Sequence, residues 1–225
     1  YRLAYKIVAP SEGIMKTLKN FGLPDKKLKF IPNPVSFHSI NDINPKISKN
    51  SVEKNFVLAA GRLEHQKGFD ILIKSFSNIE DKKIKLVILG KGSQKKNLIN
   101  LAKKEKIETN RLVFPGAVND ISLWFRKAKF FILSSRYEGW PNVLMESMAN
   151  GCPVIAFDCK HGPREIIINN FNGILVRAED QNNLTEAINS LNSSIYMQKV
   201  FKKNGLKTAK KYKSEIIAKK WFEIL

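Results

Sequence analysis

From residue 56 onward, short apolar runs alternate with longer stretches in which apolar and polar positions follow a helical spacing. The apolar runs predict strands at 56–60, 84–89, 111–114, 130–134, 153–157 and 173–176. The amphipathic stretches predict helices at 67–78, 93–105, 119–127, 141–149, 163–168 and 180–192, and two more at 194–211 and 214–224 close the chain. Short apolar strands that alternate with helices are typical of a parallel sheet with helices on both faces. The predicted fold class is therefore α/β, with a Rossmann-like sheet.

A smaller unit precedes this regular region. The pattern predicts a strand at 5–9, a helix at 11–21 that Ser11 caps, and a second strand at 28–31. Residues 35–54 are polar and lack an apolar rhythm, which indicates a linker. The predicted division of the chain is therefore an N-terminal unit (1–34), a linker (35–54), a Rossmann-like domain (55–212) and a C-terminal helix (213–225). Because the chain begins at Tyr1 rather than Met, we expect a fragment of a longer protein.

Two glutamates eight residues apart, Glu138 and Glu146, follow the predicted strand at 130–134. Pro141 suits the first position of a helix and Gly151 suits the position just past its end, so Glu138 lies in the loop and Glu146 about one turn inside the helix. The N-terminus of that helix offers backbone N–H groups and a positive dipole, which suit a phosphate. Carboxylates repel a phosphate, so the two glutamates suit the hydroxyl-rich ends of a sugar nucleotide.

A second loop follows the first strand of the regular region, at the edge where open α/β sheets bind ligands. Gly61 permits an unusual backbone angle or a close approach. Arg62 can form forked hydrogen bonds to phosphate oxygens, and Lys67 adds a compact positive charge. Gly90, after the next strand, lets a third loop bend near the same place. These residues could bind phosphate oxygens at the carboxyl ends of the strands, although a solvated basic loop is the alternative interpretation of this loop taken alone.

Several motifs resemble those of one known family, and they follow one another along the chain in the order expected for it. The Glu-x7-Glu pattern with Gly151-Cys-Pro-Val-Ile after it, the Gly61-Arg-Leu-x-x-x-Lys-Gly loop and the Ile31-Pro-Asn stretch are similar to the C-terminal domain of retaining GT-B glycosyltransferases of family four. The resemblance covers nearly the whole chain. It implies that the Rossmann-like domain is the C-terminal half of a GT-B fold. It also implies that residues 1–34 are the remnant of an N-terminal acceptor domain, and that the last helix returns toward that domain.

The resemblance implies roles for individual residues. Arg62 and Lys67 would clamp the donor diphosphate, and Glu138 completes the set of expected catalytic residues. Backbone groups around Gly116 and Ala117 would read the edge of the base. Glu138 would take the sugar hydroxyls and Glu146 the ribose hydroxyls. The expected nucleotide-sugar contacts are Gly61, Arg62, Lys67, Gly90, Gly116, Ala117, Glu138, Gly139, Asn142, Val143, Leu144 and Glu146.

The implied reaction is transfer of a hexosyl or N-acetylhexosaminyl group, with retention, from a nucleotide sugar to a cell-surface or lipid-linked glycan. UDP is the nucleotide that the family favours. Front-face attack, in which the leaving phosphate helps to deprotonate the acceptor, accounts for retention, and Glu138 is the one candidate nucleophile. The sugar, acceptor and linkage stay open, because acceptor contacts belong to the missing part. We expect the fragment alone to be inactive.

Two further polar segments have weaker signals. The loop at 160–166 should border the sugar pocket, with Arg164 and Glu165 as polar candidates, although helix-surface charges are an equal interpretation. His65 lies between Arg62 and Lys67, and we interpret it as an exposed loop residue rather than a base.

The sequence predicts neither a metal site nor a cofactor. It contains no Asp-x-Asp pair, and its three histidines are widely spaced. In a metal-free mechanism, Arg62 and Lys67 would neutralise the departing nucleoside diphosphate. Cys152 and Cys159 fit a reducing cytosol and core packing rather than a disulfide framework.

The chain is strongly basic, with a formal net charge of +19, and residues 199–220 hold nine lysines against one acid, Glu215. Nucleic acid is the usual interpretation of such a charge, but no zinc finger, helix-turn-helix signature or RNP-type aromatic strand is visible. A solvated lysine face is one alternative, and attraction to an anionic membrane leaflet or a diphosphate-linked lipid is another. No apolar run reaches the ~18 residues of a membrane helix. We expect a cytoplasmic protein, peripheral at the inner face of the membrane, that does not bind nucleic acid.

Three alternatives remain at this stage. One is a relative of glycogen or sucrose synthase that uses an ADP- or GDP-sugar and shares the motifs. A second, from another class, is a basic nucleic-acid-binding module. A third is a non-catalytic sensor of sugar nucleotides, which the short length favours.

Overall fold

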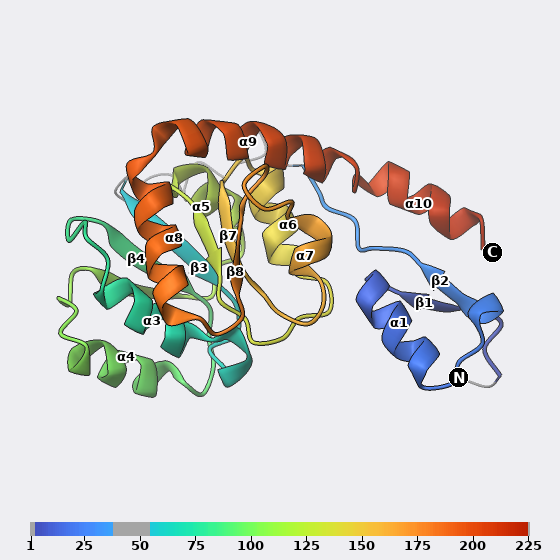
Figure 1. Ribbon diagram of the computed structural model, residues 1–225, viewed down its shortest axis with the longest axis horizontal. Helices are drawn as coiled ribbons and strands as arrows, with labels where there is room; N and C mark the ends of the chain where they lie inside the picture. The colour runs from blue at the N-terminus through green and yellow to red at the C-terminus, as the bar shows by residue number, and fades with distance from the viewer. Residues whose placement is uncertain (1–2, 38–54, 225) are drawn as a thin grey trace.

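The computed structural model describes residues 3–37 and 55–224, which form a small unit and a large one (Figure 1). The small unit consists of strand β1 (Ile7–Ala9), helix α1 (Glu12–Asn20), a 3-10 turn (Asp25–Lys27) and strand β2 (Leu28–Phe30), with the two strands parallel. Ser11 caps α1 by accepting a hydrogen bond from the Ile14 N–H. The predicted elements of this unit are confirmed, with shorter ends. Most of the predicted linker, 38–54, lies outside the described residues.

The large unit is built on a six-stranded parallel sheet. Its strands are β3 (Phe56–Ala60), β4 (Lys85–Leu89), β5 (Leu112–Gly116), β6 (Phe131–Leu133), β7 (Val154–Asp158) and β8 (Ile174–Arg177). Their order across the sheet is β5-β4-β3-β6-β7-β8, so the winding reverses between β3 and β6. This is the order of the Rossmann fold, in which the reversal leaves a crevice at the carboxyl ends of the two central strands. The predicted fold class is confirmed.

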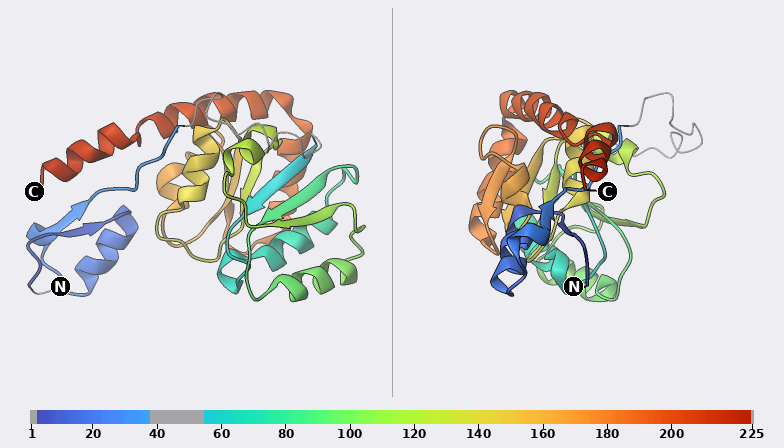
Figure 2. Two further views of the ribbon diagram at one scale, coloured as in Figure 1. Left: turned by 180° about the vertical axis from the view of Figure 1, so that it is seen from behind. Right: turned by 90° about the vertical axis from the view of Figure 1, so that its right-hand side faces the viewer.

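Helices cover both faces of this sheet. They are α3 (Phe69–Ser77), α4 (Lys95–Lys104), α5 (Ser122–Lys127), α6 (Asn142–Ala149), α7 (Pro163–Ile166) and α8 (Gln181–Ser193), followed by α9 (Ile195–Lys210) and α10 (Ser214–Phe222). One core, beneath α3, α4 and α8, includes Phe76 and Ile188. The other, beneath α5 and α6, includes Phe125 and Met148. The views from the front and from behind show these two layers (Figures 1 and 2).

The last two helices connect the units. Phe201 in α9 packs into the first core and Ala209 into the second, so α9 crosses from one layer to the other. Beyond it, α10 leaves the sheet and lies beside the small unit (Figure 1), where the Lys220 ammonium sits 5.7 Å from the centre of the Phe30 ring. Val35 donates its N–H to the carbonyl of Tyr212, which lies between α9 and α10 (2.8 Å). This hydrogen bond connects the end of the small unit to the start of α10.

Several helix starts differ from the sequence expectation, among them α4 and α5, which begin two and three residues later than expected, at Lys95 and Ser122. Two other differences have local reasons in the backbone. The helix predicted at 67–78 begins at Phe69, because a 3-10 turn (His65–Lys67) precedes it and Gly68 lies between the two with a left-handed φ of 62°. Pro141 is the N-cap of α6 rather than its first residue, since its ψ of 87° is not helical. Gly151 follows the end of α6 with a φ of 70°, as expected.

Candidate active site

A cavity of about 610 Å³ lies at the carboxyl ends of the central strands, beside the point where the winding of the sheet reverses. It is bordered by the last residues of β3 and β4, the loops that follow them, and the loop from β6 to α6. Its lining residues are Ala60, Gly61, Arg62, Lys67, Leu89, Gly90, Lys91, Ala117, Val118, Ile121, Glu138, Trp140, Pro141, Asn142 and Val143. Cationic, carboxylate and apolar side chains therefore converge on a single space, which is the composition of a polar ligand site.

Eight of the residues expected from the sequence line this cavity. They are Gly61, Arg62, Lys67, Gly90, Ala117, Glu138, Asn142 and Val143. The other four, Gly116, Gly139, Leu144 and Glu146, do not line it. The Gly116 carbonyl accepts the Gly90 N–H (2.8 Å), so Gly116 supports the wall from behind. Leu144 is fully buried, and its N–H donates to the Pro141 carbonyl (3.0 Å), whereas Asn142 and Val143, just before it, line the cavity.

The loops after β3 and β4 pack tightly against each other. The Gly61 N–H donates to the Leu89 carbonyl (3.0 Å), and the Leu63 N–H donates to the Lys91 carbonyl (2.9 Å). Gly90 has a φ of 139°, and a Cβ atom there would lie 1.9 Å from the Gly61 carbonyl oxygen. Only glycine allows this backbone contact, so the floor of the cavity depends on Gly90.

Lys67 and Glu138 meet across the reversal point. The Lys67 Nζ lies 2.6 Å from Glu138 Oε1, and the two side chains are 15% and 8% exposed. Ions this far removed from water need a partner, so each charge stabilises the other. Arg62, in contrast, is exposed and donates a long hydrogen bond (3.4 Å) to Gln66 Oε1. An anion that enters the cavity could therefore bind Arg62 directly, but it could bind Lys67 only by displacing the Glu138 carboxylate.

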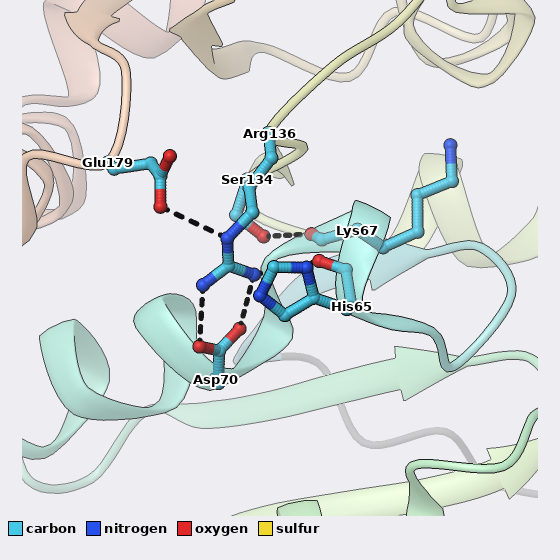
Figure 3. A network of polar contacts seen from close by, with 6 residues as sticks. All are labelled: His65, Lys67, Asp70, Ser134, Arg136 and Glu179. Atoms are coloured by element: carbon cyan, nitrogen blue, oxygen red, sulfur yellow. Dashed lines mark hydrogen bonds and ion pairs between the residues drawn. The ribbon is translucent and has the colours of Figure 1, made fainter.

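A network around Arg136 lies next to the cavity, and the sequence analysis missed it (Figure 3). The guanidinium donates to both carboxylate oxygens of Asp70 (2.8 and 2.7 Å), to the His65 carbonyl (2.7 Å) and to Glu179 (3.0 Å). Burial alone would raise the pKa of Asp70, but the hydrogen bonds and charge of Arg136 outweigh it and lower that pKa. The hydrogen bonds to Asp70 raise the pKa of Arg136 in turn. The sequence signal was slight, because Arg136 stands beside Glu138 but its partner is distant in the chain.

The loop at 160–166 does not line the cavity, but it packs against the segment that does, because a Cβ atom at Gly162 would lie 2.6 Å from Pro141 Cδ. Its expected position beside a sugar pocket stays a prediction. The Arg164 guanidinium pairs with both oxygens of Asp158 (2.8 and 2.7 Å). The Glu165 carboxylate accepts the N–H groups of Glu12 and Gly13 (2.7 and 3.1 Å) at the start of α1, so this loop also contacts the small unit. His65 is exposed, as expected.

Cys152 and Cys159 are not among the residues that line this cavity. Burial raises the pKa of Cys152 to about 12 and that of Cys159 to about 11, which suits packing rather than nucleophilic work. Among residues 3–37 and 55–224, no group of three or more His, Cys, Asp or Glu side chains is placed to hold a metal ion. In the same part of the chain, no helix is both long and apolar enough to cross a membrane.

Comparison with known proteins identifies the family. The model of the family "Glycosyl transferases group 1" matches residues 41–208, and the chain belongs to that family. The chain is 34% identical, over its whole length, to the amylovoran biosynthesis glycosyltransferase AmsD of Erwinia amylovora, of which it covers 63%. It is 29% identical, over 97% of its length, to a Campylobacter jejuni protein named N-acetylgalactosamine-N,N'-diacetylbacillosaminyl-diphospho-undecaprenol 4-alpha-N-acetylgalactosaminyltransferase, and covers 59% of it. The chain thus spans about three fifths of the length of these relatives.

Solved structures agree on the fold. HepE of Anabaena in complex with UDP superimposes on 99% of this chain with a TM-score of 0.88 and 22% identity, and the match covers 64% of that protein. TarM of S. aureus, in a complex that contains UDP, gives a TM-score of 0.87 and 23% identity over 99% of this chain and 44% of that protein. The Rossmann-like domain is therefore the corresponding part of a GT-B glycosyltransferase fold.

Proposed function

We propose that this cavity binds a nucleotide sugar, with UDP as its nucleotide, and that the chain is the donor-binding half of a retaining glycosyltransferase. The group transferred is hexosyl or N-acetylhexosaminyl, and the acceptor is a cell-surface or lipid-linked glycan. The relative from Campylobacter jejuni carries a diphospho-undecaprenol acceptor in its name, and the solved structures of HepE and TarM hold UDP. Those properties support the proposal by analogy.

The observation that carries the proposal is the cavity in which Arg62, Lys67 and Glu138 converge at the reversal point of the sheet. Arg62 and Lys67 bind the diphosphate, together with the N–H groups of Asn142 and Val143 at the start of α6. When a phosphate takes Lys67, the Glu138 carboxylate loses its partner and accepts hydrogen bonds from the sugar hydroxyls instead. The nucleotide sugar therefore takes the place of each partner in the ion pair between Lys67 and Glu138.

The nucleoside side of the ligand rests on the loop after β5 and on α6. Backbone groups around Ala117, supported by Gly116, read the base, and Val118 and Ile121 offer it an apolar surface. Glu146 binds the ribose hydroxyls from its position one turn inside α6. Glu146 does not line the cavity, so in this assignment the ribose extends beyond the lining residues toward α6.

The reaction follows from the charges in the cavity. The bond between the anomeric carbon and the diphosphate oxygen breaks, and the acceptor oxygen attacks from the same face. The acceptor proton passes to the departing phosphate oxygen, so configuration is retained without a protein nucleophile. Arg62 and Lys67 stabilise the negative charge that develops on the leaving group, which is the task a metal ion performs in other enzymes.

The acceptor side of the proposal includes the membrane. Helices α9 and α10 carry most of the lysines between residues 199 and 220, and Trp221 and Phe222 on α10 are 44% and 75% exposed. Lysine with exposed aromatic residues favours peripheral contact with an anionic leaflet. A cytoplasmic enzyme with this surface would remain near a lipid-linked acceptor.

A calorimetric titration tests the donor assignment. UDP, ADP, GDP, two UDP-sugars and a single-stranded oligonucleotide are titrated separately at physiological salt. We expect UDP and at least one UDP-sugar to bind, and the oligonucleotide neither to bind nor to compete. Preference for ADP or GDP would assign the relatives of glycogen or sucrose synthase instead. Binding of the oligonucleotide without UDP would reject a glycosyltransferase donor site.

A further inference from the structure

Arg136 does not line the cavity, yet its side chain joins three segments of the large unit, one of which, the loop after β3, borders the cavity. Its side chain is 13% exposed and uses all three guanidinium nitrogens. Asp70 belongs to the first turn of α3, His65 to the loop after β3, and Glu179 to the loop after β8. Figure 3 shows the three partners around one guanidinium, with the Lys67 side chain extending away from them. Nothing in the proposed donor chemistry uses these contacts.

Backbone contacts place the same two loops in a fixed register. The Arg136 N–H donates to the Gln66 carbonyl (2.8 Å), and the Gln66 amide donates back to the Tyr137 carbonyl (3.0 Å). The Ser134 hydroxyl donates to the Lys67 carbonyl (2.9 Å). The contact is so close that a Cβ atom at Gly68 would lie 2.0 Å from the Ser134 carbonyl oxygen. Three hydrogen bonds and one close backbone contact therefore hold the loop that carries Lys67 against the loop that carries Glu138.

We propose that Arg136 is a positioning residue of the donor site, which holds Lys67 and Glu138 at the distance that a sugar diphosphate requires. This inference rests on the proposed function of the cavity. Asp70 fixes the start of α3, and so the turn that ends at Lys67, while the backbone of Arg136 is two residues from Glu138. One guanidinium thereby sets both ends of the ion pair.

The guanidinium is suited to this position in a way that an ammonium is not. Arginine presents a planar fork that matches a carboxylate with two parallel hydrogen bonds, and here it also reaches a carbonyl and a second carboxylate. Lysine at residue 136 would keep the charge but bind one of these groups at a time. Charge alone would therefore not restore the geometry of the loops.

The test compares Arg136→Lys, Arg136→Gln and Asp70→Asn with Arg164→Gln as a matched control. Arg164 makes the same two-bonded pair with Asp158, away from the cavity. For each protein, the affinities for UDP and for uridine are measured by calorimetry, and the melting temperature by differential scanning fluorimetry. The ratio of the two affinities isolates the diphosphate contribution, and a general loss of folded protein does not change it.

We expect all three network variants to lower this ratio by about tenfold or more, the scale on which loss of one hydrogen bond to a charged group acts. Arg164→Gln should leave the ratio unchanged, whatever it does to the melting temperature. Equal ratios in the wild type and in Asp70→Asn, or recovery of the wild-type ratio in Arg136→Lys, would overturn the inference. If the wild type itself binds neither UDP nor a UDP-sugar, the proposed function fails, which is a separate result.

Discussion

At the scale of single side chains, the ion pair between Lys67 and Glu138 is central to the proposed function. Both groups are largely buried, so the two charges neutralise each other within the cavity. In the proposed function, a diphosphate substitutes for the carboxylate at Lys67, and sugar hydroxyls substitute for the ammonium at Glu138. Recognition of the sugar would then be linked to recognition of the diphosphate.

Replacing either cation should selectively weaken UDP. Arg62→Ala and Lys67→Ala remove hydrogen bonds to charged oxygens, so we expect each to cost roughly 1.5–3 kcal/mol in UDP binding and far less for uridine. Calorimetry with both ligands measures the difference. Because Lys67→Ala also leaves the buried Glu138 unpaired, its control is Lys67→Ala/Glu138→Gln compared with Glu138→Gln alone. Equal losses for UDP and uridine would mean that neither cation touches the diphosphate.

The two glutamates should separate by ligand. Glu146→Gln removes a charged acceptor from the ribose, so we expect UDP binding to weaken by roughly 1–3 kcal/mol. Glu138→Gln should not weaken UDP, because the carboxylate competes with phosphate for Lys67, but it should abolish the additional affinity that a UDP-sugar has over UDP. Titrations with UDP and a UDP-sugar measure both effects, with melting temperatures as the folding control. Identical effects on UDP would contradict the assigned roles.

At the scale of elements, local patterns predicted most of the secondary structure but not the contacts between loops. The strand expected at 153–157 is β7 (Val154–Asp158), because a run of apolar residues is a local property. The pairs Lys67–Glu138 and Asp70–Arg136 join positions 71 and 66 residues apart, and only the strand order brings their loops together. Glu165 likewise meets the start of α1 from 153 and 152 residues away, at Glu12 and Gly13.

The pairing of Asp70 with Arg136 makes a contribution to stability that is lost in acid. The pKa of Asp70 is lowered in the folded protein, so the folded state binds its proton less readily than the unfolded chain does. Its contribution is complete above the unfolded value of ~3.9 and is lost as the pH falls through the folded value. We expect Asp70→Asn to cost about 1–2 kcal/mol at pH 7, allowing for the partial exposure of Asp70. In urea unfolding, the difference in free energy of unfolding between the wild type and Asp70→Asn should become smaller below about pH 4. A difference that stays constant down to pH 3 would contradict the lowered pKa of Asp70.

At the scale of the whole molecule, the donor residues gather in one unit while the remaining surfaces face elsewhere. The cavity lies within the large unit, at the reversal point of its sheet. Leu3 and Phe21 of the small unit, and Phe222 of α10, are 101%, 77% and 75% exposed. The proposed donor site therefore consists of residues that this chain contains, and we propose acceptor recognition for the additional length that the relatives possess.

Metal removal tests the charge balance of the whole donor site. In the proposed function, Arg62 and Lys67 supply two positive charges to a diphosphate, and residues 3–37 and 55–224 contain no group of three or more His, Cys, Asp or Glu side chains placed to hold a metal ion. We expect EDTA to leave UDP affinity unchanged, and added Mg²⁺ or Mn²⁺ to raise it by less than about twofold, or ~0.4 kcal/mol. Calorimetry in chelated and metal-supplemented buffers gives the comparison. An obligatory divalent ion would replace the proposed mechanism with a metal-assisted one.

Binding without turnover is the outcome we expect of the chain by itself. It spans 63% and 59% of the length of two relatives, and its donor cavity is already formed in this length. UDP and a UDP-sugar should therefore bind, whereas transfer of labelled sugar to a lipid-linked acceptor should remain at the level of an Arg62→Ala control. The reason is that catalysis requires the acceptor hydroxyl to be held against the anomeric carbon, and orientation of this kind can supply ~7–11 kcal/mol of the barrier. Donor residues alone cannot supply that orientation. Sustained transfer by the isolated chain, above the control, would show that acceptor binding is contained in these 225 residues.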